Sequence, residues 1–267
     1  MVWYGMGFSE IKEMICISTR DGSPEPVLFY HPGGETPVPL VVGLHTWSYD
    51  RYNQVDGMLP FCKARGWGLL LPEFRGPNLV ANPRARQAGG SAVAVQDIVD
   101  GVAMVSDRYP IDRNAVLLLG GSGGGHMSLL AAASAPGLWR GVSSWVPITD
   151  LAAWHDQNPE YAPNVAACCG GIPGTSVEVD LEYRERSAIF QVEALSGVTL
   201  SLHHGRFDPV VPYSQSWNLA RELERCGSQR FFLEIFDGEH DIRYETAFRW
   251  FDGLLRNDNN QGGRLTG

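Results

Sequence analysis

The sequence has no apolar run long enough to cross a membrane and no cluster of basic residues. Nothing in it approaches the roughly 18 apolar residues of a membrane helix. Met1 to Glu10 contain no basic region followed by an apolar stretch, as a secretory signal peptide would. Lys and Arg total 21 against 30 Asp and Glu, and phosphate binding needs clustered cations. We therefore expect a cytoplasmic protein without nucleic-acid or membrane partners.

Cysteine is scarce and irregularly spaced, which argues against a disulfide framework. The five cysteines are an odd number and include no C-x-x-C pair, as is usual in a reducing compartment. The adjacent Cys168 and Cys169 are interpreted as ordinary loop residues. The pair His203 and His204 does not have metal-ligand spacing with any cysteine or carboxylate. We expect neither a metal nor a cofactor, and the sequence does not indicate an oligomeric state.

Short apolar runs alternate with stretches of helical periodicity. The run 39–45 is almost entirely apolar, which is typical of a strand buried on both faces. Strands alternating with helices predict an α/β fold with a mostly parallel central sheet and helices on both faces. The expected strands are 12–19, 26–31, 39–45, 68–71, 115–119, 141–146, 198–203 and 231–236, and the expected helices are 54–65, 92–108, 124–135, 214–225 and 244–255.

One long segment interrupts this alternation. Residues 149–195 are too long for a simple loop and carry prolines, glycines and aromatic residues. We expect a small cap-like insertion after the sixth core strand, over the carboxyl edge of the sheet where α/β folds bind ligands. The polar, glycine-rich residues 256–267 predict a flexible tail. The whole of 1–267 is expected to form one domain.

The strongest chemical signal is the run Gly120-Gly121-Ser122-Gly123-Gly124. It matches G-x-S-x-G and lies between an expected strand and an expected helix. A nucleophile on such a sharp turn needs small neighbours, because larger side chains would clash. Neither a phosphate-binding loop nor a dinucleotide fingerprint fits, since the Gly-Lys-Ser/Thr ending is missing and His126 replaces the last glycine. The motif predicts Ser122 as a nucleophile.

A serine hydroxyl needs a base, and after such a turn the acid and the histidine follow in that order. Asp208 follows the expected strand 198–203, and His240 follows the expected strand 231–236. We predict His240 as the base and Asp208 as the residue that orients it. The carboxylates beside His240 in the sequence are too near to reach its ring comfortably.

The negative oxygen of a tetrahedral intermediate needs two amide donors. One is the amide of Gly123, directly after the nucleophile. The loop after the third strand should supply the other, and there we predict the amide of Trp47, with Thr46 as the alternative. Aromatic residues suggest an apolar or aromatic acyl group, or a sugar, in the substrate site. The predicted substrate-binding residues are Trp47, Trp145, Trp154 and Tyr161.

Taken together, these motifs resemble the catalytic domain of the prolyl oligopeptidase (S9) branch of the α/β-hydrolases. The matching stretches are 74–76, 96–98, 120–124, 183–187, 204–212 and 238–240. Peptidases of this family carry an N-terminal propeller, and the segment before Pro39 is too short to hold one. Stand-alone domains of this type are often carboxylesterases, including acetyl xylan and feruloyl esterases. In this chain His45-Thr46-Trp47 replaces the family's usual His-Gly-Gly.

The resemblance implies a serine hydrolase that forms an acyl-enzyme intermediate. From the sequence we favour a carboxylic ester hydrolase acting on a small-molecule or carbohydrate ester. The alternative is a serine peptidase or amidase of the prolyl oligopeptidase type acting on small peptides. A non-catalytic protein on this fold is disfavoured, because such proteins have typically lost a member of the triad and all three candidates are present.

Overall fold

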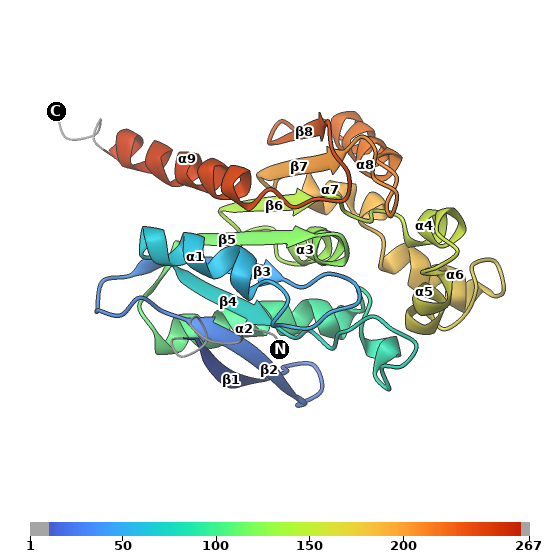
Figure 1. The fold of residues 1–267 in the computed structure, drawn as a ribbon, viewed down its shortest axis with the longest axis horizontal. Coiled ribbons are helices and arrows are strands. Elements are labelled where there is room, and N and C mark those ends of the chain that lie inside the picture. The colour runs from blue at the N-terminus through green and yellow to red at the C-terminus, as the bar shows by residue number, and fades with distance from the viewer. Residues whose placement is uncertain (1–10, 263–267) are drawn as a thin grey trace, which may run out of the picture.

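The computed structural model describes residues 11–262, which form one eight-stranded sheet with helices on both faces (Figure 1). The strand order is β1-β2-β4-β3-β5-β6-β7-β8. Strands β2 and β4 pair antiparallel, as do β1 and β2, and every pair from β4 onward is parallel. The strands are β1 (Lys12–Ile17), β2 (Pro24–Tyr30), β3 (Val38–Leu44), β4 (Gly68–Pro72), β5 (Ile111–Gly121), β6 (Gly141–Trp145), β7 (Leu200–Gly205) and β8 (Phe231–Phe236).

Two layers of helices cover the sheet because its inner strands are apolar on both faces. Val42 and Leu118 belong to the core beneath α2, α3 and α8, whereas their neighbours Val41 and Leu117 pack beneath α1 and α9. The two-residue alternation of a strand thus feeds two separate cores. The helices of these layers are α1 (Val55–Arg65), α2 (Ala92–Arg108), α3 (Gly123–Ser134), α8 (Ser214–Arg225) and α9 (Tyr244–Gly262).

The segment between β6 and β7 forms the expected insertion. Its first three helices lie beyond the carboxyl ends of the central strands (Figure 1). Leu151, Trp154 and Val165 bury their side chains in a third apolar cluster that also contains Trp47. The insertion therefore covers the edge of the sheet where the predicted site lies. Its elements are α4 (Leu151–Gln157), α5 (Ala162–Cys169), α6 (Val177–Glu185), the 3-10 turn η3 (Ala188–Phe190) and α7 (Val192–Leu195); a further 3-10 turn, η2 (Ala85–Gln87), precedes α2.

The structure also bears on the expected tail, on membrane-spanning helices and on the cysteines. A flexible tail was expected over 256–267, but α9 continues through Gly262, and 263–267 lie outside the described residues. Within 11–262, no helix combines the length and the apolar character needed to span a bilayer. All five cysteines are free thiols, and only Cys226 is exposed.

Candidate active site

Ser122 lies on a strained turn between β5 and α3. Its backbone has φ 56° and ψ −122°, a conformation that residues other than glycine rarely adopt. A methyl group at Gly120 would lie 2.1 Å from the carbonyl oxygen of Gly124, so only glycine fits at the start of the turn. The Ser122 amide donates to the Trp145 carbonyl at 2.9 Å, which ties the turn to β6. Strain held in place by neighbouring strands is the arrangement that a nucleophile elbow requires.

His240 and Asp208 meet on loops that follow neighbouring strands. The distance from His240 Nδ1 to Asp208 Oδ2 is 2.7 Å, and the Asp208 side chain is fully buried. Because Nδ1 faces the carboxylate, it carries a proton, and Nε2 is left for a partner in the pocket. Ser122 and His240 line the same pocket, so the structure brings the three predicted residues to one place.

Asp208 accepts hydrogen bonds from more groups than His240, the one partner that the sequence predicted. Its Oδ1 accepts from the amides of Val210 and Val211 at 2.8 and 2.9 Å, and His204 Nε2 lies 3.3 Å from its Oδ2. Burial by itself raises the pKa of Asp208, but hydrogen bonds from His204 and His240 outweigh it and hold the pKa well below the usual carboxyl range. Asp208 is therefore ionised whenever His240 can act as a base.

The geometry selects one of the two proposed donors in the loop after β3. The amide of Thr46 donates to Asn53 Oδ1 at 3.1 Å, so it is not available to a substrate, and this corrects the alternative assignment. The amide of Trp47 lies beside α3: a methyl group at Gly123 would come within 2.5 Å of the Trp47 nitrogen. The amides of Trp47 and Gly123 therefore adjoin each other next to Ser122, as two donors to one oxygen must.

The pocket at Ser122 has a volume of about 260 Å³ and mostly apolar walls. Of the four aromatic residues predicted to bind substrate, Trp47 and Tyr161 line it. Sequence reasoning missed several other lining residues, because a valine or isoleucine in a loop carries no chemical signature. These are Ser48, Tyr49, Val146, Val210 and Ile242.

The other two predicted substrate-binding residues, Trp145 and Trp154, do not line the pocket. Trp145 points into the core, where its ring stacks on His203 at 3.9 Å and its Nε1 donates to Ser143. It ends β6 with its side chain on the face covered by α9. Trp154 is fully buried, contacts Trp47 edge-on at 4.9 Å and donates to the Val210 carbonyl. Trp154 thus supports the pocket wall from behind.

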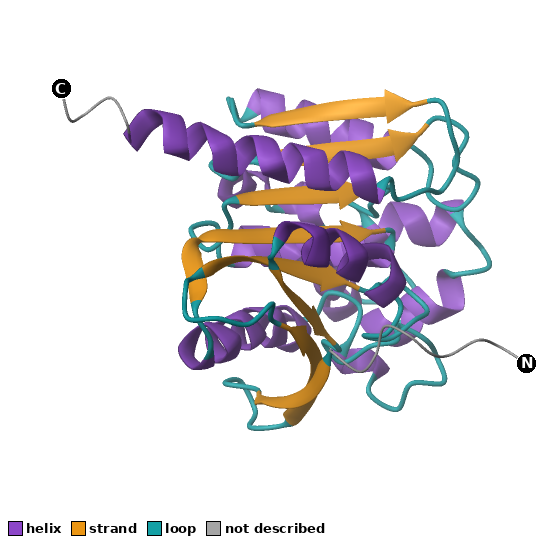
Figure 2. Cartoon of the chain, turned by 60° about the vertical axis from the view of Figure 1, so that its left-hand side comes forward, coloured by secondary structure: helices purple, strands orange, loops and turns teal. Residues whose placement is uncertain are grey.

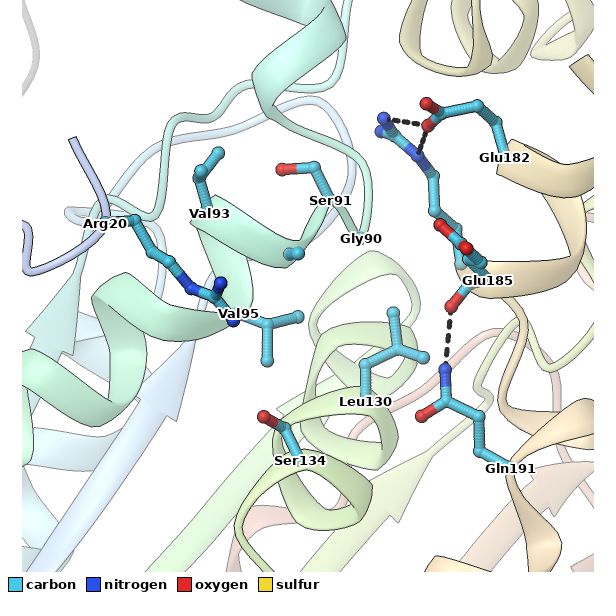
Figure 3. A pocket seen from close by; sticks show the side chains of 12 residues that line it. Arg20, Gly90, Ser91, Val93, Val95, Leu130, Ser134, Glu182, Glu185 and Gln191 are labelled. Atoms are coloured by element: carbon cyan, nitrogen blue, oxygen red, sulfur yellow. Dashed lines mark hydrogen bonds and ion pairs between the residues drawn. The ribbon is translucent and has the colours of Figure 1, made fainter. Parts of the chain in front are cut away.

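A larger hollow of about 420 Å³ lies elsewhere, at the start of α2. Figure 3 shows Arg20 on one side of it and Glu182 and Glu185 on the other. The buried Arg186 beside it is already bonded to Glu182 and to the backbone carbonyl of Ala88. This hollow contains neither Ser122 nor His240, so we place the candidate chemistry in the smaller pocket.

A family model described as the prolyl oligopeptidase family, Peptidase_S9, matches residues 83–257. The chain therefore belongs to the prolyl oligopeptidase family and is a serine hydrolase. A curated relative, acylamino-acid-releasing enzyme 1 of Oryza sativa subsp. japonica, is 26% identical over 241 residues, which cover 86% of this chain and 29% of that protein.

Solved structures share the fold. A puromycin-hydrolysing peptidase of Mycobacterium tuberculosis superposes with a TM-score of 0.72 at 22% identity, covering 91% of this chain and 38% of the other. An acylaminoacyl peptidase of Pyrococcus horikoshii gives a TM-score of 0.72 at 17% identity, covering 92% and 41%. The chain thus spans well under half the length of these relatives and matches the α/β-hydrolase fold of their catalytic domains.

Proposed function

We propose that this chain is a serine peptidase that cleaves amide bonds in small peptides, with Ser122, His240 and Asp208 as its catalytic triad. The observation that carries the proposal is the 2.7 Å bond between Asp208 and His240, the histidine that lines the same pocket as the strained Ser122. Membership of a peptidase family supports an amide substrate. The names of the relatives, an acylamino-acid-releasing enzyme and a puromycin-hydrolysing peptidase, support it further.

The proposed reaction follows from the positions of the donors and acceptors. Ser122 Oγ attacks the carbonyl carbon while His240 Nε2 takes its proton, and Asp208 stabilises the imidazolium that results. The developing oxyanion accepts from the amides of Gly123 and Trp47. His240 then gives its proton to the leaving amine, and a water molecule that it deprotonates releases the acid from Ser122.

The pocket walls favour an uncharged acyl side. Among the described residues that line it there is no Asp, Glu, Lys or Arg. A charged substrate group would lose its hydration there without gaining a partner. We expect acyl groups of modest size and apolar character to fit between Trp47, Tyr161 and Val210.

The sequence alone favoured ester substrates, including acetyl and feruloyl esters of carbohydrates. That expectation rested on the resemblance to stand-alone domains of this type, whereas the matching family model is that of a peptidase family and the curated relative is named an acylamino-acid-releasing enzyme. A triad of this kind also cleaves activated esters, because their leaving groups need little protonation. Ester hydrolysis is therefore the competing hypothesis, and the experiment below tests both substrates.

Hydrolysis of an N-acetyl-aminoacyl p-nitroanilide by the wild type should be lost by at least about 10⁴-fold in Ser122→Ala. Ser134→Ala, which removes an exposed hydroxyl at the far end of α3, is the matched control and should keep full activity. A fluorophosphonate should label the wild type and not Ser122→Ala. Turnover of p-nitrophenyl butyrate, methyl ferulate or acetylated xylan with no turnover of any anilide would reject the peptidase in favour of the esterase.

A further inference from the structure

A chain of side-chain hydrogen bonds begins at the loop that carries the Trp47 amide. Asn53 Oδ1 accepts from the Thr46 amide at 3.1 Å and also from Gln54 Nε2 at 2.8 Å. Gln54 Oε1 in turn accepts from the hydroxyl of Tyr244 at 2.7 Å. We call Asn53, Gln54 and Tyr244 the hydrogen-bond relay. It links three places in the sequence: the loop after β3, the start of α1 and the start of α9.

Each link of the relay fixes the orientation of the next. A backbone N–H can only donate, so the Asn53 oxygen must face Thr46. The Gln54 amide must then turn its NH₂ toward that oxygen, which points its own oxygen at Tyr244. Gln54 is 2% exposed, so this oxygen has no access to bulk water and depends on the Tyr244 hydroxyl.

The far end of the relay is held firmly. Tyr244 packs so closely on α1 that a methyl group at Gly57 would lie 2.5 Å from its ring carbon Cζ. Burial raises the pKa of Tyr244, so its hydroxyl keeps its proton and remains a donor. Tyr244 is the first residue of α9 and follows His240 by four positions. Figure 2 shows α1 and α9 together in front of the sheet.

We propose that the relay positions the Trp47 amide for the oxyanion by fixing the loop after β3 to the segment that carries His240. By holding the Thr46 amide, Asn53 fixes the peptide unit that precedes the one carrying the Trp47 N–H, and so restrains the direction of that N–H. The relay residues touch no reacting atom and are positioning residues. This proposal rests on the proposed function, because it needs an oxyanion at Ser122.

The test measures transition-state stabilisation in Asn53→Ala and Tyr244→Phe. Removing one oxyanion donor outright costs about 10²–10³ in kcat. A misplaced donor should cost less, so we expect a loss of about 10-fold or more in Asn53→Ala at nearly unchanged KM. Affinity for a peptide trifluoromethyl ketone, which forms a tetrahedral adduct with a serine, should fall by the same factor as kcat/KM. The midpoint of the pH–rate profile should not move, because His240 and Asp208 are untouched.

Three comparisons separate positioning from a general loss of structure. Asn53→Asp keeps an acceptor oxygen for the Thr46 amide and should recover most of the kcat lost in Asn53→Ala. The double variant Asn53→Ala/Tyr244→Phe should lose no more than Asn53→Ala alone, because both changes break one chain. Tyr52 lies in the same loop, and its hydroxyl donates to Glu13 at the surface. Tyr52→Phe deletes this hydroxyl and should leave kcat and KM at the wild-type values.

The possible results distinguish the two proposals. If the wild type is active but Asn53→Ala keeps its kcat, or if the two changes multiply, the relay has no positioning role while the proposed function stands. A loss of kcat without loss of inhibitor affinity also overturns the relay. A wild type that cleaves neither anilides nor esters and resists fluorophosphonate overturns the proposed function, and the role of the relay falls with it.

Discussion

Two histidines contact Asp208, and only His240 lines the pocket. His204 is fully buried, and its Nε2 faces the Val211 carbonyl at 2.8 Å as well as Asp208 Oδ2. A carbonyl oxygen only accepts, so His204 Nε2 carries a proton. Its Nδ1 lies 2.7 Å from the hydroxyl of Ser216, a buried residue of α8. His204 thus anchors Asp208 to the body of the fold.

Replacing His204 should weaken catalysis by loosening Asp208. We expect His204→Gln to lower kcat about 10-fold, well short of the roughly 10⁴-fold loss that Asp208→Asn should cause. KM should change little, since neither residue lines the pocket. Steady-state kinetics on the anilide substrate measures both. A His204→Gln enzyme with wild-type kcat, or one as impaired as Asp208→Asn, would contradict an anchoring role. His155→Gln, in α4, is the matched control.

The sequence could single out Ser122, Asp208 and His240 as candidates for one site, because their motifs depend on local backbone chemistry and on chain order, and the structure brings them together. It could not separate Trp47 from Trp145. Both tryptophans lie near strand ends, and which face a side chain takes depends on the register of the strand. The contact of His204 with Asp208 could not be predicted either, because His204 is held by Ser216, which comes from a helix whose packing the sequence does not reveal.

At the scale of elements, the turn after β4 joins three parts of the fold through one arginine. Arg75 is 1% exposed and has φ 69°. Its guanidinium pairs with Asp97 of α2 and with Asp21 of the β1–β2 turn, and it lies 3.3 Å from the buried Glu25 of β2. The side chains of Asp97 and Glu25 are buried and need a cation, whereas Asp21 is exposed, so the arginine holds the β1–β2 hairpin against α2 through Glu25 and Asp97.

Removing Arg75 should leave the buried Asp97 without its cationic partner, whereas Glu25 keeps its ion pair with Arg84. We expect Arg75→Met to lower the free energy of unfolding by about 3–5 kcal/mol. The control is Arg113→Ala: the pair of Arg113 and Asp107 is exposed on both sides, and such pairs contribute less than about 1 kcal/mol. Urea denaturation followed by tryptophan fluorescence measures both. If both variants lowered the free energy of unfolding by the same amount, the buried ion pairs of Arg75 would stabilise the fold no more than the exposed pair of Arg113.

The ends of most elements could be predicted to within a few residues, and the misses have local causes. Strand β5 begins at Ile111, four residues before its expected start. The intervening Asp112, Arg113 and Asn114 are polar and partly exposed, so they carry no strand signal. The helices of the insertion were not predicted individually. They have four to nine residues each, too few for a helical period to be recognised.

For the whole molecule, the order of strands and helices sufficed to predict the fold, since parallel strands with helical crossovers have few arrangements. The same α/β architecture buries ionisable groups that the sequence cannot distinguish from exposed ones. His126 is an example: it follows Ser122 by one helical turn and is fully buried in α3. Its Nε2 donates to the Arg186 carbonyl at 2.6 Å.

Burial lowers the pKa of His126 to about 4; the hydrogen bond to the Arg186 carbonyl opposes this shift, and the charge of the Arg186 guanidinium adds to it. In the unfolded chain this histidine binds a proton below about pH 6.5, whereas in the folded chain it does so only near pH 4. Between these values the unfolded state holds more protons, so the free energy of unfolding should fall as the pH falls, by about 1.4 kcal/mol per pH unit.

Urea unfolding at about pH 8.5, 7.5, 6.5, 5.5 and 4.5 measures this dependence of the free energy of unfolding on pH. His126→Gln keeps an N–H donor for the Arg186 carbonyl but cannot titrate. Below pH 6.5 its free energy of unfolding should therefore fall less steeply than that of the wild type, by about 1.4 kcal/mol per pH unit, the slope that one titrating proton produces. Above pH 7 the two slopes should coincide, because neither state then protonates the histidine. Parallel curves across the whole range would mean that His126 is protonated equally in the folded and unfolded chains.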